Sequence, residues 1–142
     1  MNPTFFKDKI AVITGGSHGI GLATAQEFIK VKAKVAVIDE NPFDEKFDLF
    51  FRGDLANEAD LNAFADKVIE RFGKVDYLIN NACISRGGIL SNCSYDDFLY
   101  VQKVGVVAPY MLTKLLLPHF NKDGAIVNIS STRAFQSQAR CV

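Results

Sequence analysis

Short apolar runs alternate with segments of helical periodicity along most of the chain. Runs that stay apolar without alternation are typical of strands buried on both faces of a sheet. Five such runs are present, at residues 10–14, 35–39, 49–52, 75–80 and 125–130. We therefore predict five strands, with helices in most of the connections between them.

Apolar residues between the runs recur every three or four positions, which predicts helices that pack by one face. The first of these faces holds Leu22, Ala25, Phe28 and Ile29. The second holds Leu61, Phe64, Ala65, Val68 and Phe72, and the third includes Phe98, Val101, Gly105, Ala108, Leu112 and Leu115.

Polar residues mark where these helices start. Asn57 with Asp60 three positions later, and Ser94 with Asp97, are both typical of capped helix N-termini. Pro118 is expected to end the third helix, and Pro109 inside it is expected to cause a kink. The connection after residue 39 is short and contains Pro42, so any helix there is brief.

Strands alternating with helices predict a parallel sheet with helices on both faces. Because crossover connections are right-handed, a doubly wound sheet is the simplest topology. The length of 142 residues predicts a single domain, residues 1–142.

Composition excludes several classes of partner. Sixteen acidic residues balance sixteen basic ones, so nothing favours nucleic acid or an anionic membrane surface. No apolar run approaches the roughly 18 residues of a membrane span, and the first residues lack the pattern of a signal peptide. The cysteines are odd in number and show no CxxC spacing, which indicates reduced thiols in a cytoplasmic protein and no metal site; they are Cys83, Cys93 and Cys141.

A glycine-rich turn, TGGSHGIG, occupies residues 14–21, between the first strand and the first helix. Such a turn lets the backbone and the helix N-terminus approach a phosphate closely. Leu22 follows the last glycine where a P-loop needs Lys, and Thr24 occupies the third glycine position of GxGxxG. The pattern present is TGxxxGxG. A tight turn without a ligand is the alternative.

Asp39 closes the second strand, 18 residues after Gly21. An acidic residue at about that distance lies where the ribose hydroxyls of an adenine dinucleotide bind. Its charge would repel a 2′-phosphate, so we expect NAD and consider NADP less favoured. His18 could favour that phosphate, but a histidine is mostly neutral at pH 7. The alternative is a solvated carboxylate at a strand end.

With these motifs in order, the chain resembles the short-chain dehydrogenase/reductase family from about residue 7 to its end. The remaining motifs are GDL at 53–55, NNAC at 80–83 and VNISS at 127–131. The resemblance implies a Rossmann-like sheet of five strands in the order 3-2-1-4-5. Family members continue with further helices and strands, so we expect a truncated form whose fifth strand is an open edge.

The resemblance also implies roles for single residues. Ser131 would be catalytic, donating to the carbonyl oxygen of the substrate. Cys83 stands where the family has glycine, and a small buried apolar role is favoured over redox chemistry. The cofactor-binding residues would be Gly15, Ser17, His18, Gly19, Ile20, Gly21, Asp39, Asp54, Leu55, Asn81 and Ala82.

The chain departs from the family pattern after Ser131. The family places a Tyr there, with a Lys four residues later that lowers the pKa of the phenol. None of the eleven residues after Ser131 is Tyr or Lys. Tyr110 and Lys114 have this spacing but precede Ser131, so a helix-surface pair is expected. Gly105 stands where many members carry a proton-relay Asn.

We therefore expect the N-terminal, cofactor-binding part of an NAD(H)-dependent oxidoreductase that interconverts a secondary alcohol and a ketone. The chain as written is expected to be inactive, and the full-length form to be a homo-oligomer. The alternatives are a non-catalytic dinucleotide-binding or regulatory protein, and a sheet domain without a ligand.

Overall fold

The computed structural model describes residues 3–43, 47–88 and 92–135, so Cys141 and most of the segment after Ser131 lie outside the described residues. Its single sheet has the order β3-β2-β1-β4-β5, with every neighbouring pair parallel, which confirms the expected topology. The strands are β1 (Ile10–Thr14), β2 (Lys34–Asp39), β3 (Leu49–Arg52), β4 (Val75–Asn80) and β5 (Phe120–Asn128).

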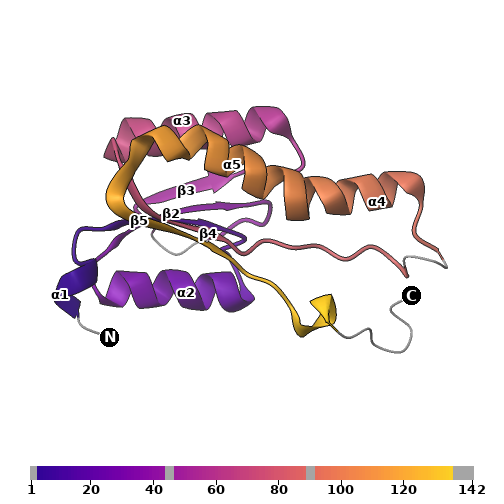
Figure 1. Cartoon of the computed structure of the whole chain (residues 1–142), viewed down its shortest axis with the longest axis horizontal. Coiled ribbons are helices and arrows are strands. Elements are labelled where there is room, and N and C mark those ends of the chain that lie inside the picture. Colours follow the sequence, from indigo (N-terminus) through magenta and orange to yellow (C-terminus); the bar gives the residue numbers. More distant parts are fainter. Residues whose placement is uncertain (1–2, 44–46, 89–91, 136–142) are drawn as a thin grey trace.

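Helices cover both faces of the sheet. α2 lies on one face, while α3 and α5 lie on the other (Figure 1). None of the helices in the described ranges is long and apolar enough to cross a membrane. The helices are α1 (Pro3–Phe6), α2 (Gly19–Lys30), α3 (Glu58–Phe72), α4 (Tyr95–Gln102), the π-helix η1 (Lys103–Val107), α5 (Ala108–Leu116), and the 3₁₀ turns η2 (Leu117–His119) and η3 (Thr132–Ala134).

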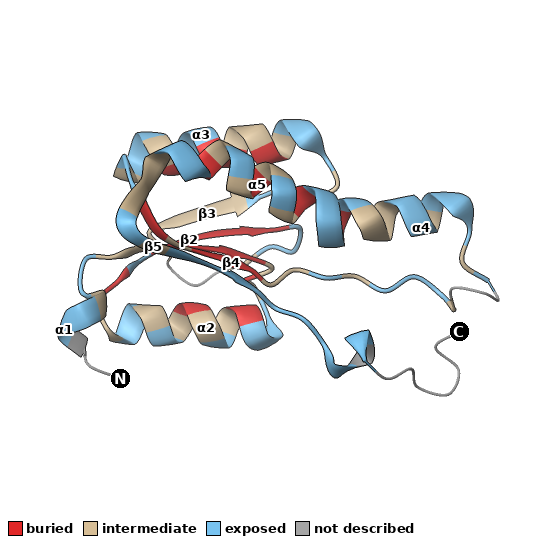
Figure 2. Cartoon of the chain, in the orientation of Figure 1, coloured by how far each residue is buried: buried red, intermediate tan, exposed pale blue. Residues whose placement is uncertain are grey.

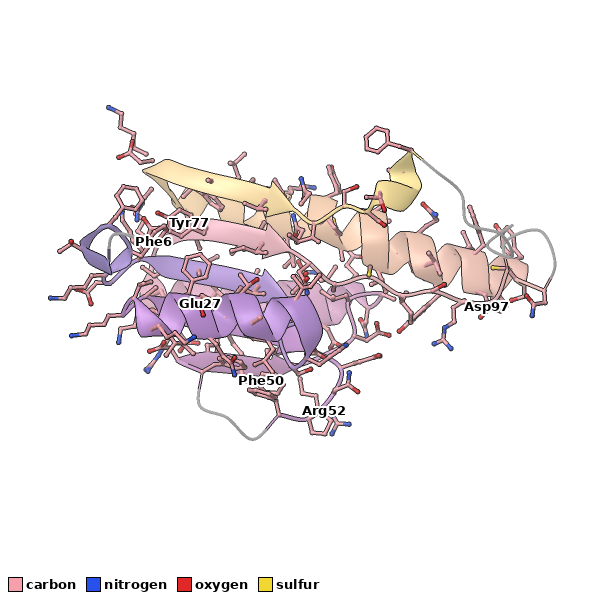
Figure 3. The ribbon with its side chains drawn as sticks, turned by 90° about the horizontal axis from the view of Figure 1, so that it is seen from below. Phe6, Glu27, Phe50, Arg52, Tyr77 and Asp97 are labelled. Atoms are coloured by element: carbon pink, nitrogen blue, oxygen red, sulfur yellow. The ribbon has the colours of Figure 1, made fainter. Side chains whose placement is uncertain are left out.

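The core has two halves, one on each side of the sheet (Figure 2). Toward α3 and α5, alternate residues of β1 and β2 pack against Phe64 and Leu112, which are fully buried. Toward α2, the other residues of these strands pack around Ala25. Phe6 from α1 lies beside Tyr77 of β4, with ring centroids 5.7 Å apart (Figure 3). Burial on both faces explains why the runs of β1 and β2 are continuously apolar.

β5 differs from the expected strand at 125–130. It starts earlier, at Phe120, and ends before Ser130. Its pairing with β4 shifts register between Val75 and Tyr77. The polar residues at its start lack the apolar run that predicts a buried strand, but a strand at the edge of the sheet can expose polar side chains to water. The apolar residues Ile126 and Val127 are 36% and 46% exposed, and no helix of the described residues covers the face of β5 opposite α5 (Figure 3).

The expected long helix is divided into α4, η1 and α5. Pro109 lies in the first turn of α5, directly after the five-residue π-helix. A proline inside an α-helix lacks an amide donor, and its ring collides with the carbonyl four residues earlier. The wider π turn accommodates both effects. The helical path therefore continues through Pro109 to Pro118.

The two predicted helix caps are both present, with one difference in detail. Ser94 and Asp97 form a reciprocal capping box at α4. Asn57 caps α3 by accepting from the Ala59 amide at 2.9 Å. Asp60 does not bond back to the cap but accepts from the amide of Asp54 at 2.8 Å, because the loop after β3 folds over the helix start.

Two polar clusters hold the central strands at opposite ends. At the amino end, Asp76 of β4 accepts from the Ile10 amide, the Lys9 ammonium and the Asn121 amide group, at 2.9–3.0 Å. At the carboxyl end, Thr14 Oγ1 accepts from the amides of Asn81 and Ala82, each at 3.0 Å. These contacts fix how β1 and β4 end relative to each other.

Asp76→Asn is predicted to lower the free energy of unfolding at pH 7 by about 1–3 kcal/mol, because three donors lose a charged acceptor. Burial alone would raise the pKa of the Asp76 carboxyl, but the bonds from Ile10, Asn121 and Lys9 outweigh it and lower the pKa. The stabilisation is therefore complete above the unfolded pKa of about 3.9 and is lost as the pH falls through the lower folded value. Urea unfolding should show the wild-type advantage shrinking below about pH 4. The exposed Asp66→Asn change is the control, and a pH-independent advantage would contradict this prediction.

Thr14→Val is predicted to cost about 1–3 kcal/mol of unfolding free energy, since it keeps the side-chain shape but removes the acceptor of two partly buried amides. Thr14 itself is buried. Thr132→Val, at an exposed position, is the matched control and should change stability by less than about 0.5 kcal/mol. Equal effects of the two changes in urea unfolding would show that the Thr14 hydroxyl does not join the strands.

Candidate functional site

A cavity of about 460 Å³ lies where the strands end. Open α/β sheets place ligand sites in the crevice at the carboxyl ends of their strands, and this volume falls within the usual range for small-molecule sites. Its walls come from the turn after β1, the ends of β2, β3 and β4, and the α4–η1 helix. The lining residues are Gly15, His18, Gly19, Ile20, Asp39, Glu40, Asn41, Gly53, Asp54, Leu55, Asn81, Ala82, Cys83, Ile84, Ser85, Tyr100 and Val104.

The turn after β1 needs its glycines for two different reasons. Gly15 and Gly19 have φ angles of +68° and +57°, in the left-handed region that side chains disfavour. Gly21 is needed for space, because a Cβ there would overlap the carbonyl oxygen of Gly15. The first turn of α2 therefore packs directly against the turn that follows β1.

The N-terminus of α2 is open toward the cavity. His18 occupies the N-cap position but its side chain makes no capping hydrogen bond. A Cβ built on Gly19 would meet nothing within 4 Å, so the approach to this helix end is free. The first amides of a helix lack intrahelical acceptors and carry about half a positive charge. This arrangement suits an anionic group such as a phosphate.

Asp39 faces the same turn. Its Oδ2 accepts from the Ser17 amide at 3.0 Å and lies 4.0 Å from His18 Nδ1, and its Oδ1 accepts from the Asn41 backbone and side chain at 3.0 and 3.1 Å. Burial alone would raise the pKa of the Asp39 carboxyl, but the bonds from Ser17 and Asn41 outweigh it and lower the pKa. The carboxylate is therefore ionised at neutral pH and sits in the cavity wall.

Asn81 braces this side of the cavity. Its side-chain amide donates to the carbonyl oxygens of Thr14 and Gly15, both at 3.0 Å. Its backbone amide bonds to Thr14 Oγ1. The positions of the Gly15 turn and of Ala82 are therefore set by one residue that follows β4.

Asp54 meets a residue from a distant part of the chain. Its Oδ1 accepts from the Ala56 amide at 2.8 Å and from the Tyr100 hydroxyl at 3.1 Å. The guanidinium of Arg86 lies 5.3 Å from the centre of the Tyr100 ring. Burial and the neighbouring Asp54 charge raise the pKa of the Tyr100 phenol, which keeps it protonated as a donor.

The structure brings nine of the eleven proposed cofactor-binding residues to the cavity wall. Of the other two, Ser17 contributes its amide to Asp39, and Gly21 is buried behind Gly15. Ser131, proposed as catalytic, is exposed and does not line this cavity. Tyr110 and Lys114 are exposed on α5 and lie outside the lining, as expected for a surface pair.

The expectation that Cys83 is buried is wrong. It is exposed, with a free thiol, because the chain turns away from the sheet directly after β4 and places it in the cavity wall. Gly105, at the position of the relay Asn, is also exposed, and a Cβ there would meet nothing within 4 Å.

Sequence reasoning missed several residues of the cavity. Glu40, Gly53 and Ile84 adjoin residues that the motifs did identify, so their position at strand ends was a usable signal. Tyr100 and Val104 carry no such signal. They lie four residues apart on one helical face, but only the angle of α4 and η1 across the sheet shows that this face lines a cavity.

Comparison with known proteins identifies relatives of this chain. The family model of the short chain dehydrogenases matches residues 9–142. An uncharacterized oxidoreductase of Thermotoga maritima is 34% identical over 92% of this chain and 56% of its own length. An L-fucose dehydrogenase of Mus musculus is 34% identical over 90% of this chain and 50% of its own length. The chain thus spans about half the length of these relatives.

Solved structures agree with this result. A short chain dehydrogenase from Burkholderia cenocepacia, in complex with NADP, has a TM-score of 0.85 at 28% identity and covers 95% of this chain and 60% of its own. A 3-ketoacyl-(acyl-carrier-protein) reductase from Brucella melitensis, complexed with NADH, has a TM-score of 0.84 at 29% identity. The match covers 96% of this chain and 62% of the reductase. The matching sheet and motifs, together with the family match over nearly all its residues, show that this chain belongs to the short chain dehydrogenase family.

Proposed function

We propose that this chain is the cofactor-binding part of an NAD(H)-dependent oxidoreductase. The observation that carries the proposal is that one cavity is lined both by the uncapped N-terminus of α2 and by the ionised Asp39 carboxylate. These two features complement the two polar parts of an adenine dinucleotide, its negatively charged pyrophosphate and its ribose hydroxyls.

Each part of the cofactor has a proposed set of partners. The pyrophosphate would lie against the backbone of Gly15, Gly19 and Ile20, which line the cavity. A Cβ on Gly19 would meet nothing within 4 Å, which leaves room at that point. The adenine would lie near Asp54 and Leu55, and Ala82 would pass beneath the cofactor. The bound nicotinamide would supply hydride transfer, and Ser131 would donate to the carbonyl oxygen of the substrate.

The preference for NAD over NADP rests on Asp39. A carboxylate has about four acceptor positions. The Ser17 amide and both amides of Asn41 donate to Asp39, and the Ser17 side chain also stabilises its charge. The ribose hydroxyls would bind by replacing the side-chain contacts of Ser17 and Asn41. A 2′-phosphate at the same place would meet the like charge of the Asp39 carboxylate.

The whole protein would interconvert a secondary alcohol and a ketone, as a homo-oligomer in the cytoplasm. The exposed free thiol of Cys83 supports a reducing compartment. Residues 1–142 contain Ser131 but no Tyr-x-x-x-Lys after it. We therefore propose that this polypeptide binds the cofactor and is catalytically inactive or very weak.

Titration with reduced cofactors tests the binding site. NADH is expected to bind at least about tenfold more tightly than NADPH, and Asp39→Asn should reduce that ratio about tenfold, since a bond to a charged group contributes about 1.5–3 kcal/mol. Cofactor fluorescence gives both dissociation constants, and circular dichroism confirms the fold. Asp66→Asn, far from the cavity lining, is the charge-matched control. Absence of NADH binding, or tighter binding of NADPH, would contradict the proposal.

Turnover measurements test the proposal that this polypeptide is catalytically inactive or very weak. Purified residues 1–142 should oxidise no NADH with a panel of ketones and reduce no NAD with a panel of secondary alcohols, because the proton-transferring Tyr and Lys are lacking. Normal turnover would refute this. If DNA beyond codon 142 encodes Tyr-x-x-x-Lys, in frame or after a frameshift, a truncated enzyme is supported. Its absence would favour a non-catalytic binding protein.

A further inference from the structure

Tyr100 connects two parts of the cavity wall that are distant in sequence. It lies on α4, which extends beyond the sheet on the side where the strands end (Figure 1). Its hydroxyl donates to Asp54 Oδ1 across 46 residues of chain, at 3.1 Å. Both side chains belong to residues that line the cavity. The bond therefore spans the wall instead of lying on the outer surface.

The Asp54 carboxylate is held by only one of its oxygens. The Ala56 amide and the Tyr100 hydroxyl both donate to Oδ1, and no described residue donates to Oδ2. Two donors on one oxygen restrict the rotation of the carboxylate about its Cβ–Cγ bond. The second oxygen is thereby kept available to a donor from a ligand in the cavity.

The Tyr100 ring is itself restrained. The Arg86 guanidinium lies 5.3 Å from its centre, a cation–π arrangement that favours one orientation of the ring. A raised pKa keeps its phenol protonated, so it remains a hydrogen-bond donor to Asp54 across the neutral range. Arg86 and Tyr100 therefore act together on the position of one carboxylate.

We propose that Tyr100 is a positioning residue that directs the free oxygen of Asp54 at the exocyclic amine of the adenine base. The inference rests on the proposed binding of an adenine dinucleotide. A carboxylate can only accept hydrogen bonds, so a site held this way selects a base that carries an amine. Hypoxanthine has a carbonyl oxygen at the same position, and its lone pairs would face those of Asp54.

The test compares NADH with reduced nicotinamide hypoxanthine dinucleotide, whose base has a carbonyl oxygen in place of the amine and a hydrogen on the adjacent ring nitrogen. The unchanged protein should bind NADH about tenfold more tightly. Tyr100→Phe should weaken NADH binding about fivefold and change binding of the hypoxanthine analogue less than about twofold, because the loss of one hydrogen bond affects only the amine contact. Tyr110→Phe, at a residue 63% exposed on α5 and outside the cavity lining, should leave both constants unchanged. Asp54→Asn should also reduce the discrimination.

The outcomes separate this inference from the proposed function. If Tyr100→Phe weakens both ligands equally, its role is structural and the inference is overturned. The inference is also overturned if the change affects neither ligand, or if the unchanged protein binds both equally well. If the unchanged protein binds neither, the proposed function fails and the inference fails with it.

Discussion

The hydrogen bonds that converge on Thr14 set the geometry of this molecule. One hydroxyl oxygen receives the amides of Asn81 and Ala82, and the Asn81 side chain returns to the carbonyls of Thr14 and Gly15. Two central strands thereby end in a fixed relation, and the glycine turn between β1 and α2 is held open. The cavity, the free end of α2 and the approach to Asp39 all depend on this small cluster at the middle of the sheet.

Much of this architecture could be predicted from the sequence because a strand that is buried on both faces is apolar at nearly every position. β1 and β2 must be apolar at nearly every position, and parallel strands must be joined by helices. The glycines were also readable, since few other residues adopt positive φ or leave room for the Gly15 carbonyl. The positions of the turn and of Asp39 followed from these local requirements.

What could not be predicted depends on contacts between distant elements. The early start of β5 depends on its lying at an edge, where Lys122 and Asp123 remain exposed. The π-helix before Pro109 depends on how the backbone relaxes around one ring. The exposure of Cys83 depends on the path of the chain after β4, and the reach of Tyr100 to Asp54 depends on the angle of α4. The hydrophobic pattern and the spacing of the motifs indicate none of these features.

The position of β5 at the edge of the sheet makes local stability against unfolding differ between the strands. β1 is paired on both sides and covered on both faces, while among the described residues β5 has a single partner strand and no helix over one face. Backbone amides of β5 consequently open to solvent at a lower free-energy cost than those of β1. Among the strands, deuterium uptake from D₂O would therefore reach β5 before β1, the strand that leads into the glycine turn of the site.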